Sequence, residues 1–236
     1  MSNRAPGSMG KGADTRAART RGIITAAAAD QFLENGFLGA SMDEIAAAAG
    51  VSKQTVYAHF ESKEALFLAM VQGLTGGAAD SFRQRRDDPT GDEPIERFLL
   101  DFATLQLQIV MTPRLMRLRR LVIGEVGRFP ELGRALHEKG PGHSIGRLAR
   151  AFAVYGDKGD LTVGNAREAA SFFNWLVMGG PVNDAMLLGD EAILGKAAIA
   201  RQAREAVRIF LAAYGGASPS LLPLREKDRG TPQRRE

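Results

Sequence analysis

Cysteine is absent from the 236-residue sequence, and histidine occurs only three times. The absence of thiols excludes disulfide frameworks, thiol catalysis and every cysteine-ligated metal site. His137 and His143 are six residues apart, which is not the i, i+4 spacing that places two imidazoles on one helix face. We expect both to be solvated loop residues. No spacing of serine, histidine and carboxylate residues indicates a catalytic set, so the sequence predicts no metal, no cofactor and no enzyme activity.

A long apolar run is also missing. No segment approaches the roughly 20 apolar residues that cross a bilayer, and residues 1–22 lack the apolar stretch of a secretion signal. With 44% hydrophobic and 25% charged residues, the composition is that of an ordinary globular protein. We expect a cytoplasmic protein with no membrane partner.

Basic charge is concentrated at the two ends of the chain. Residues 1–22 hold five basic residues against one acidic residue, and residues 224–236 hold five against three. The formal charge of +4 therefore leaves the stretch between them net acidic. Glycine- and proline-rich ends are usually disordered, and basic ones also act as arms that neutralise phosphates. We expect a basic flexible arm over residues 1–17 and a flexible tail over residues 217–236.

Apolar residues recur at helical spacing along the chain, and alternating strand patterns are hard to find. Ile24, Ala28 and Phe32 step by four, and Asn35-Gly36 ends that helix because glycine adopts the left-handed conformation without a steric cost. Charged residues, proline and glycine over residues 86–92 mark a loop. The sequence predicts an all-α chain, with a small helical unit over residues 18–75 and a larger helical body over residues 76–216.

Residues 41–60 have the layout of a helix-turn-helix. Ser41 caps a short helix and Glu44 completes a capping box, Gly50 forms the turn, and Ser52 caps a second helix. The second helix turns polar groups away from its apolar side, and these are of the types that bond base edges and phosphates. They are Lys53, Gln54, Thr55, Tyr57 and His59.

The alternative is a purely structural helical hairpin, and the local charge favours it. Residues 23–75 contain two basic residues, Lys53 and Lys63, against six acidic ones. DNA-binding units are usually basic. If this segment binds DNA, we expect its affinity to depend on the basic arm that precedes it.

From about Ala18 to Phe67, the sequence resembles the DNA-binding domain of the TetR family of bacterial transcriptional regulators. The matching stretches are IITAAAADQFLENGF, SMDEIAAAAGVSKQTVYAHF and ESKEALF, in that order. The resemblance implies three helices that form a DNA-binding domain, joined by a fourth helix to an all-helical domain for effector binding and dimerisation. More distantly, Leu115–Leu136 resembles the effector domain of AefR-like and AcrR-like regulators.

The resemblance also assigns roles to individual side chains of the first domain. Lys53, Gln54 and Thr55 fall on positions that contact base edges or the adjacent backbone, whereas Tyr57, His59 and Lys63 fall on phosphate positions. The capping hydroxyls are expected to face phosphate as well. The predicted DNA-binding set is Ser41, Ser52, Lys53, Gln54, Thr55, Tyr57, His59 and Lys63.

Aromatic residues and methionines are concentrated in the body, where they form either the core or an apolar cavity for an effector. The predicted cavity residues are Phe98, Phe102, Met116 and Phe152, together with Glu125. Glu125 falls on the apolar stripe of its helix, either as the salt-bridge partner of an arginine such as Arg128 or Arg134 or as the counter-charge of a cationic effector. By resemblance, the predicted dimer interface contains Phe172, Phe173 and Trp175.

These features predict a homodimeric, ligand-responsive repressor that binds a near-palindromic operator and is released by a small lipophilic effector. The alternative function is a helical enzyme acting on a lipophilic small molecule, for which the sequence offers no convergent acid, base or nucleophile. Gly73, Gly76 and Gly77 fall in the fourth helix. Each glycine weakens a helix interior by about 1 kcal/mol, so these residues either end that helix or form a hinge in it.

Overall fold

The computed structural model of the chain describes residues 9–85 and 91–216, and over these residues the regular structure is helical apart from an isolated bridge between Leu161 and Gly215. The prediction of an all-α chain is confirmed. The N-terminal helices are α1 (Met9–Gly39), α2 (Met42–Ala49), α3 (Lys53–His59) and α4 (Lys63–Arg85). The body contains α5 (Ile95–Val110), α6 (Pro113–Glu125), α7 (Pro130–Lys139), α8 (Pro141–Asp157), α9 (Ala166–Leu188), the 3₁₀ turn η1 (Asp190–Ala192) and α10 (Lys196–Tyr214).

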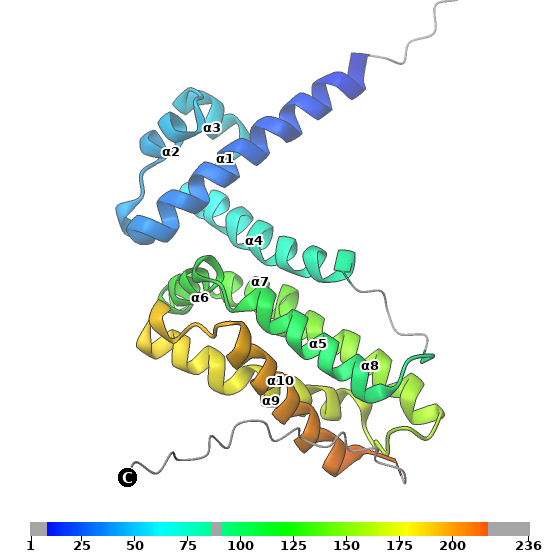
Figure 1. Cartoon of the computed structure of the whole chain (residues 1–236). Helices are drawn as coiled ribbons and strands as arrows, with labels where there is room; N and C mark the ends of the chain where they lie inside the picture. The colour runs from blue at the N-terminus through cyan, green and yellow to red at the C-terminus, as the bar shows by residue number, and fades with distance from the viewer. Residues whose placement is uncertain (1–8, 86–90, 217–236) are drawn as a thin grey trace, which may run out of the picture.

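The helices form two units of unequal size, which α4 joins. In Figure 1, α1, α2 and α3 form a small unit at one end of the molecule, and α5 to α10 form a larger bundle at the other. Helix α4 leaves the small unit and runs along the side of the bundle (Figure 1). Any group that contacts the second half of α4 is therefore in a position to act on the orientation of the small unit.

Two helix boundaries differ from the sequence expectations, and one predicted break is present. Helix α1 begins at Met9, so residues 9–17 of the expected flexible arm are helical, whereas residues 1–8 and the expected tail over 217–236 lie outside the described residues. The predicted break at Gly36 is present, with φ 72° and ψ 176°, a conformation that is nearly exclusive to glycine. Helix α4 passes through Gly73, Gly76 and Gly77 and across the expected boundary between residues 75 and 76, so the glycines do not end it.

The small unit shares its hydrophobic core with the body. Phe32 of α1, Ile45 of α2 and Val56 of α3 are fully buried, and their cluster, here named the N-terminal cluster, also contains Leu118 and Val122 of α6. Helix α7 contributes further buried side chains to the same cluster. Burying a leucine or valine side chain stabilises a fold by about 1.5–3 kcal/mol. The small unit is thus held on the body by apolar packing against α6 and α7 as well as by the chain connection through α4.

A second cluster fills the body. Its centre is aromatic: the rings of Phe152, Phe173 and Phe210 are 5.0 to 6.2 Å apart, centroid to centroid, and all three side chains are buried. Phe98 and Met116 are buried in the same cluster. These residues hold α5, α6, α8, α9 and α10 together.

Ion pairs join helix α6 to α1 on one side and to η1 on the other. Arg114 lies 2.7 Å from Asp30 of α1, and Arg117 and Arg120 lie 3.1 and 2.6 Å from the carboxylate of Asp190 in η1. Arg120 also donates to the carbonyl of Ala185, near the end of α9. Hydrogen bonds from the two guanidinium groups, that of Arg120 above all, hold the pKa of Asp190 below its ordinary value. The α6 helix therefore links α1 of the small unit to the α9–α10 corner of the body.

The ion pairs of Asp190 with Arg117 and Arg120 should stabilise the fold measurably at pH values at which the carboxyl group is ionised. We expect Asp190→Asn to lower the free energy of unfolding by about 1 kcal/mol at neutral pH, the upper range for partly exposed ion pairs. Because the folded-state pKa is depressed, this contribution is complete above the unfolded-state pKa and is lost as the pH falls towards the folded-state value. Urea unfolding followed by circular dichroism at several pH values measures it.

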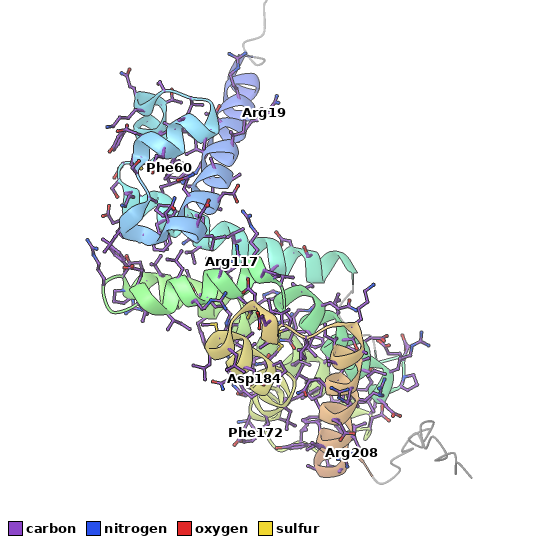
Figure 2. All side chains as sticks on the ribbon, turned by 60° about the vertical axis from the view of Figure 1, so that its left-hand side comes forward. Arg19, Phe60, Arg117, Phe172, Asp184 and Arg208 are labelled. Atoms are coloured by element: carbon purple, nitrogen blue, oxygen red, sulfur yellow. The ribbon has the colours of Figure 1, made fainter. Side chains whose placement is uncertain are left out.

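The matched control is Asp184→Asn, which removes an exposed carboxylate of α9, labelled in Figure 2, that has no ion pair within the described residues. That variant should unfold like the parent protein. An Asp190→Asn variant whose stability deficit stays constant down to acidic pH would contradict the assigned role.

Candidate nucleic-acid interface and ligand cavity

The turn between α2 and α3 is built by local hydrogen bonds that the sequence predicts. Ser41 Oγ accepts a hydrogen bond from the Glu44 amide at 3.2 Å, and the Glu44 carboxylate accepts from the Ser41 amide at 3.3 Å, which completes the capping box. Gly50 adopts the left-handed conformation, with φ 66° and ψ 30°. The Val51 amide then donates to the Ala46 carbonyl at 3.0 Å. These contacts fix the angle at which α3 leaves α2.

Helix α3 turns its apolar side inwards and its polar side to solvent. Val56 is fully buried and anchors it, whereas Lys53, Gln54 and Tyr57 are exposed. Thr55 and His59 are half-buried. Ser52 Oγ accepts from the Thr55 amide at 3.1 Å and lies 2.8 Å from the Thr55 hydroxyl, so both hydroxyls are engaged in the cap. The exposed set that remains for a partner is thus centred on Lys53, Gln54 and Tyr57.

Lys53 is held by a carboxylate of the neighbouring helix. Its ammonium lies 2.9 Å from Asp43 of α2, and both side chains are more than half exposed. The hydrogen bond from Lys53 to Asp43 raises the pKa of the lysine above its ordinary value, so the group stays charged. A phosphate or base that binds Lys53 must therefore compete with Asp43. Asp43 is one of the six acidic residues over residues 23–75, and nothing in its spacing predicts this pair.

Two further basic residues stabilise the small unit from within. Arg21 of α1 donates to the His59 carbonyl at 2.7 Å, and its guanidinium lies 4.0 Å from the centre of the Phe60 ring. Lys63, predicted to contact phosphate, donates to the Ala40 carbonyl at 2.7 Å and lies 4.6 Å from the Phe37 ring centre. Arg21 thus fastens the end of α3 to α1, and Lys63 fastens the start of α4 to the end of α1.

The outer part of α1 carries exposed positive charge beside this surface. Arg16 and Arg19 are exposed on the helix, and Figure 2 shows Arg19 on the stretch of α1 that extends beyond the buried Phe60. The basic arm expected from the sequence is therefore, from Met9 onwards, a helical extension that presents its arginines at a defined place.

A cavity lies in the body beside the second half of α4. It encloses about 830 Å³, part of it open to solvent, and it is lined by α4 through α9. Thr75, Ala78 and Ala79 are the α4 residues in its wall. The apolar lining includes Phe102, Ile109, Leu118, Met178 and Val182. Small-molecule sites in proteins are typically lined by apolar side chains in this way, with a few polar groups among them.

The polar lining of the cavity is basic or neutral. Arg119 of α6, Lys139 of α7 and Arg147 of α8 bring positive charge, and no aspartate or glutamate is among the lining residues that the structure describes. Gln106 and Asn174 form a buried amide pair in the wall, with a hydrogen bond of 2.8 Å between them. His143 also lines the cavity from within α8, so it is not a loop residue, whereas His137 is exposed on α7.

Of the five residues that the sequence places in an effector site, the cavity wall contains Phe102 alone. Phe98, Met116 and Phe152 are buried side chains of the body core. Glu125, the last residue of α6, is half-buried and lies outside the cavity lining. Among the described wall residues there is therefore no carboxylate to hold a cationic effector. The polar groups of the cavity, which the sequence does not predict, are cationic side chains and amides. Their signal in the sequence is weak, because arginines and glutamines on helices are mostly exposed.

The predicted dimer residues separate into two groups. Phe172 and Trp175 are 52% and 47% exposed on α9, whereas Phe173 is fully buried against Phe152 and Phe210. Phe173 therefore belongs to the core, because the next residue on a helix points about 100° away from its neighbour. Leu187, Leu188 and Ile209 extend the exposed apolar set. Figure 2 shows Phe172 on the surface of the body, at the end away from α1.

Within residues 9–85 and 91–216, no three histidine or acidic side chains gather as metal ligands do. In the same part of the chain, no helix combines the length and the apolarity that a membrane span requires.

Two family descriptions match the chain in the order of its two units. Residues 24–70 match bacterial regulatory proteins of the tetR family, and residues 97–216, half of the chain, match the C-terminal domain of AefR-like transcriptional repressors. Among curated relatives, the HTH-type transcriptional activator FasR of Mycolicibacterium smegmatis is 42% identical over 72 residues, which are 29% of this chain and 33% of that protein. The HTH-type transcriptional regulator UidR of Escherichia coli is 43% identical over 70 residues. The match thus spans about a third of these relatives.

Solved structures match over a much larger share of the chain. A putative TetR-family transcriptional regulator from Mesorhizobium loti is 36% identical, with a TM-score of 0.79 over 85% of this chain and 98% of that one. The flavonoid-responsive regulator FrrA is 33% identical, with a TM-score of 0.69 over 85% of this chain and all of that one.

The exposed residues of α3 should differ in what they contribute to DNA binding. We expect Gln54→Ala to weaken binding to the preferred duplex by about 1–3 kcal/mol, the range for a lost base contact, and to leave binding to a scrambled duplex unchanged. Fluorescence anisotropy with a duplex selected from a random pool, and with its scrambled form, measures both affinities.

The matched control is Gln72→Ala, which shortens an exposed glutamine of α4 outside the helix-turn-helix. This variant should bind both duplexes like the parent protein. If Gln54→Ala weakens binding to the two duplexes in equal proportion, the residue does not read sequence.

Proposed function

The chain belongs to the TetR family of bacterial transcriptional regulators, which bind DNA through a helix-turn-helix, and from this premise we propose that it is a homodimeric repressor released from its operator by a small lipophilic effector. The observation that carries the proposal is the position of the cavity. Its wall includes Thr75, Ala78 and Ala79 of α4, the helix that leads directly out of the DNA-binding unit. A ligand in this cavity touches that helix.

The proposed dimer presents two copies of α3 to DNA. Recognition helices of two-fold dimers enter successive major grooves about 34 Å apart, which requires a near-palindromic operator. Exposed Phe172 and Trp175 of α9 form the proposed contact between the two copies. Trp175 also lines the cavity. An effector in the cavity therefore lies beside the proposed dimer contact as well as beside α4.

Contacts to DNA are proposed for the exposed residues of α3 and for the outer part of α1. Lys53, Gln54 and Tyr57 face solvent from α3, while Arg16 and Arg19 supply the positive charge that the rest of the unit lacks. Ser41, Ser52, Thr55, His59 and Lys63 complete the proposed set. The hydroxyls of Ser41 and Ser52 and the ammonium of Lys63 also hold the unit together.

The relatives support an effector of lipophilic character and a negative sign of regulation. The structural relative FrrA is described as flavonoid-responsive, and the family matched by the body is described as that of AefR-like repressors. A curated relative, FasR, is described as an activator, and its match covers a third of that protein. The family that matches the body therefore supports repression as the mode of regulation.

The proposal is tested by DNA binding with and without ligand. The full chain should retard a duplex from the region upstream of its own gene, and should bind as a dimer in analytical ultracentrifugation. A compound that raises the melting temperature in a thermal-shift screen stabilises the folded state by mass action. We expect such a compound to release the DNA, and a ligand that binds without changing DNA affinity would contradict the regulatory role.

The glycines of α4 provide a test of the route from cavity to DNA. A Cβ atom added at Gly76 or Gly77 would meet no heavy atom within 4 Å, so both positions accept alanine without a clash. We expect the double variant Gly76→Ala, Gly77→Ala to be more stable by up to about 1 kcal/mol per site. DNA affinity without effector should change little, whereas release should require a higher effector concentration, because a stiffer α4 resists bending. Dose–response in a gel-shift assay gives that concentration.

Gly22→Ala is the matched control, since Gly22 lies within α1 and an added Cβ atom also meets nothing within 4 Å. It should stabilise its helix and leave effector release unchanged. Release of the double variant at the parent concentration would remove the α4 glycines from the mechanism.

A further inference from the structure

We propose that the cavity accepts a hydroxylated lipophilic organic acid whose carboxylate is bound by Arg119 and Arg147. The inference rests on the proposed function, because it names the chemical class of the effector. It follows from the charge of the cavity wall, from the state of Arg119 and from the amide pair formed by Gln106 and Asn174.

The arginines of α6 differ in their partners. Arg117 and Arg120 form ion pairs with Asp190 of η1, and Figure 2 labels Arg117 on α6. Arg119 lies between them in sequence but faces the cavity. No carboxylate of the described residues pairs with it, and its Nε atom is buried without a hydrogen-bond partner. Burial lowers the pKa of Arg119, as expected for a charge withdrawn from water.

A partly buried cation without a counter-ion is costly, and an anion that enters the cavity reduces that cost. Arg147 of α8 reinforces the preference, since it lines the same cavity and is only 5% exposed. Lys139 adds a third positive charge from the end of α7. Guanidinium groups bind carboxylates through parallel charged hydrogen bonds, which are stronger than neutral ones. The lining therefore favours a carboxylate and disfavours an amine.

The body of the ligand must be apolar. Phe102, Leu118, Met178 and Val182 line the cavity with side chains that offer no hydrogen bonds. A small hydrated anion such as sulfate would leave this wall in contact with water, whereas an aromatic or aliphatic chain covers it. The cavity thus requires an amphipathic ligand with one charged end.

The amide pair adds a hydroxyl to this description. The side-chain nitrogen of Gln106 donates to the side-chain oxygen of Asn174 at 2.8 Å, and the side-chain oxygen of Gln106 is buried without a hydrogen-bond partner. A buried polar atom without a hydrogen bond is costly, so a ligand that donates to it gains affinity. A hydroxyl group on the apolar body supplies this hydrogen bond and stays neutral beside the arginines.

The test compares matched ligands on the full-length protein by isothermal titration calorimetry. Two scaffolds are used, aromatic 4-hydroxycinnamate and aliphatic 10-hydroxydecanoate, each against its methyl ester, together with cinnamate and the amine tyramine. At least one hydroxy acid should bind at least about tenfold more tightly than its ester, as expected for the loss of a charged hydrogen bond. Cinnamate should bind more weakly than 4-hydroxycinnamate, and tyramine should not compete.

Variants then assign the charge preference to Arg119. In Arg119→Gln, acid and ester should bind with nearly equal affinity, whereas Arg119→Lys should keep part of the preference. Arg134→Gln, which removes an exposed charge of α7 outside the cavity lining, should behave like the parent protein. The ligand-free Arg119→Gln protein should melt no earlier than the parent, since an uncompensated buried charge is gone. A large drop in melting temperature would show that Arg119 is structural and overturn the proposal.

Three further outcomes also overturn it: esters or tyramine that bind as tightly as the acids, a preference for acids that survives Arg119→Gln, and no binding of either acid below about 1 mM. The gel-shift assay separates this inference from the proposed function. An acid that binds with the expected pattern but does not release DNA leaves the ligand class standing and refutes release. A neutral compound that releases DNA supports release by an effector and refutes the proposed ligand class.

Discussion

Helix α6 is packed into two hydrophobic clusters at once, and the arrangement of the molecule depends on this double burial. Leu118 and Val122 are buried with the side chains of the DNA-binding unit, while Met116 is buried in the body core. Ion pairs to Asp30 on one side and Asp190 on the other fix the same helix. A shift of α6 relative to the body therefore changes packing in the small unit, because close-packed side chains transmit displacement.

Helix α6 also forms part of the cavity wall. Leu118 is both a member of the N-terminal cluster and a wall residue, and Arg119 follows it directly in the chain. A ligand that pulls on Arg119 thus acts one residue away from a side chain in the core of the DNA-binding unit. Together with the α4 residues in the wall, this gives the proposed effector two physical contacts with the part of the molecule that meets DNA.

The sequence predicts the parts of this structure that are determined locally. The caps at Ser41 and Ser52 and the glycine turn at Gly50 need only neighbouring residues, and all of them are present. The cavity is not local, since its wall is assembled from six helices. Apolar composition does not separate a core phenylalanine such as Phe152 from a wall residue such as Phe102.

Polar residues of the site escape sequence analysis for the same reason. Arg119 and Arg147 are ordinary helical arginines until the fold turns them inwards. Adjacent Phe172 and Phe173 look equivalent in composition, and only the rotation of α9 places one at the surface and the other in the core. Arg21 counts in the sequence only as part of the basic N-terminal end, but in the fold it joins α1 to the end of α3.

The pairing of Lys53 with Asp43 bears on how the protein searches a genome. Random duplex offers phosphates everywhere, and an unrestrained lysine would lengthen each futile encounter through its attraction to them. A lysine that already has a carboxylate partner gains less from a random phosphate, so residence on arbitrary duplex is shortened. Only a duplex that also satisfies the neighbouring side chains of α3 compensates for the exchange of partners. With the proposed contact of Lys53 to DNA, this pairing would lower the affinity for every duplex and shorten the search for the operator.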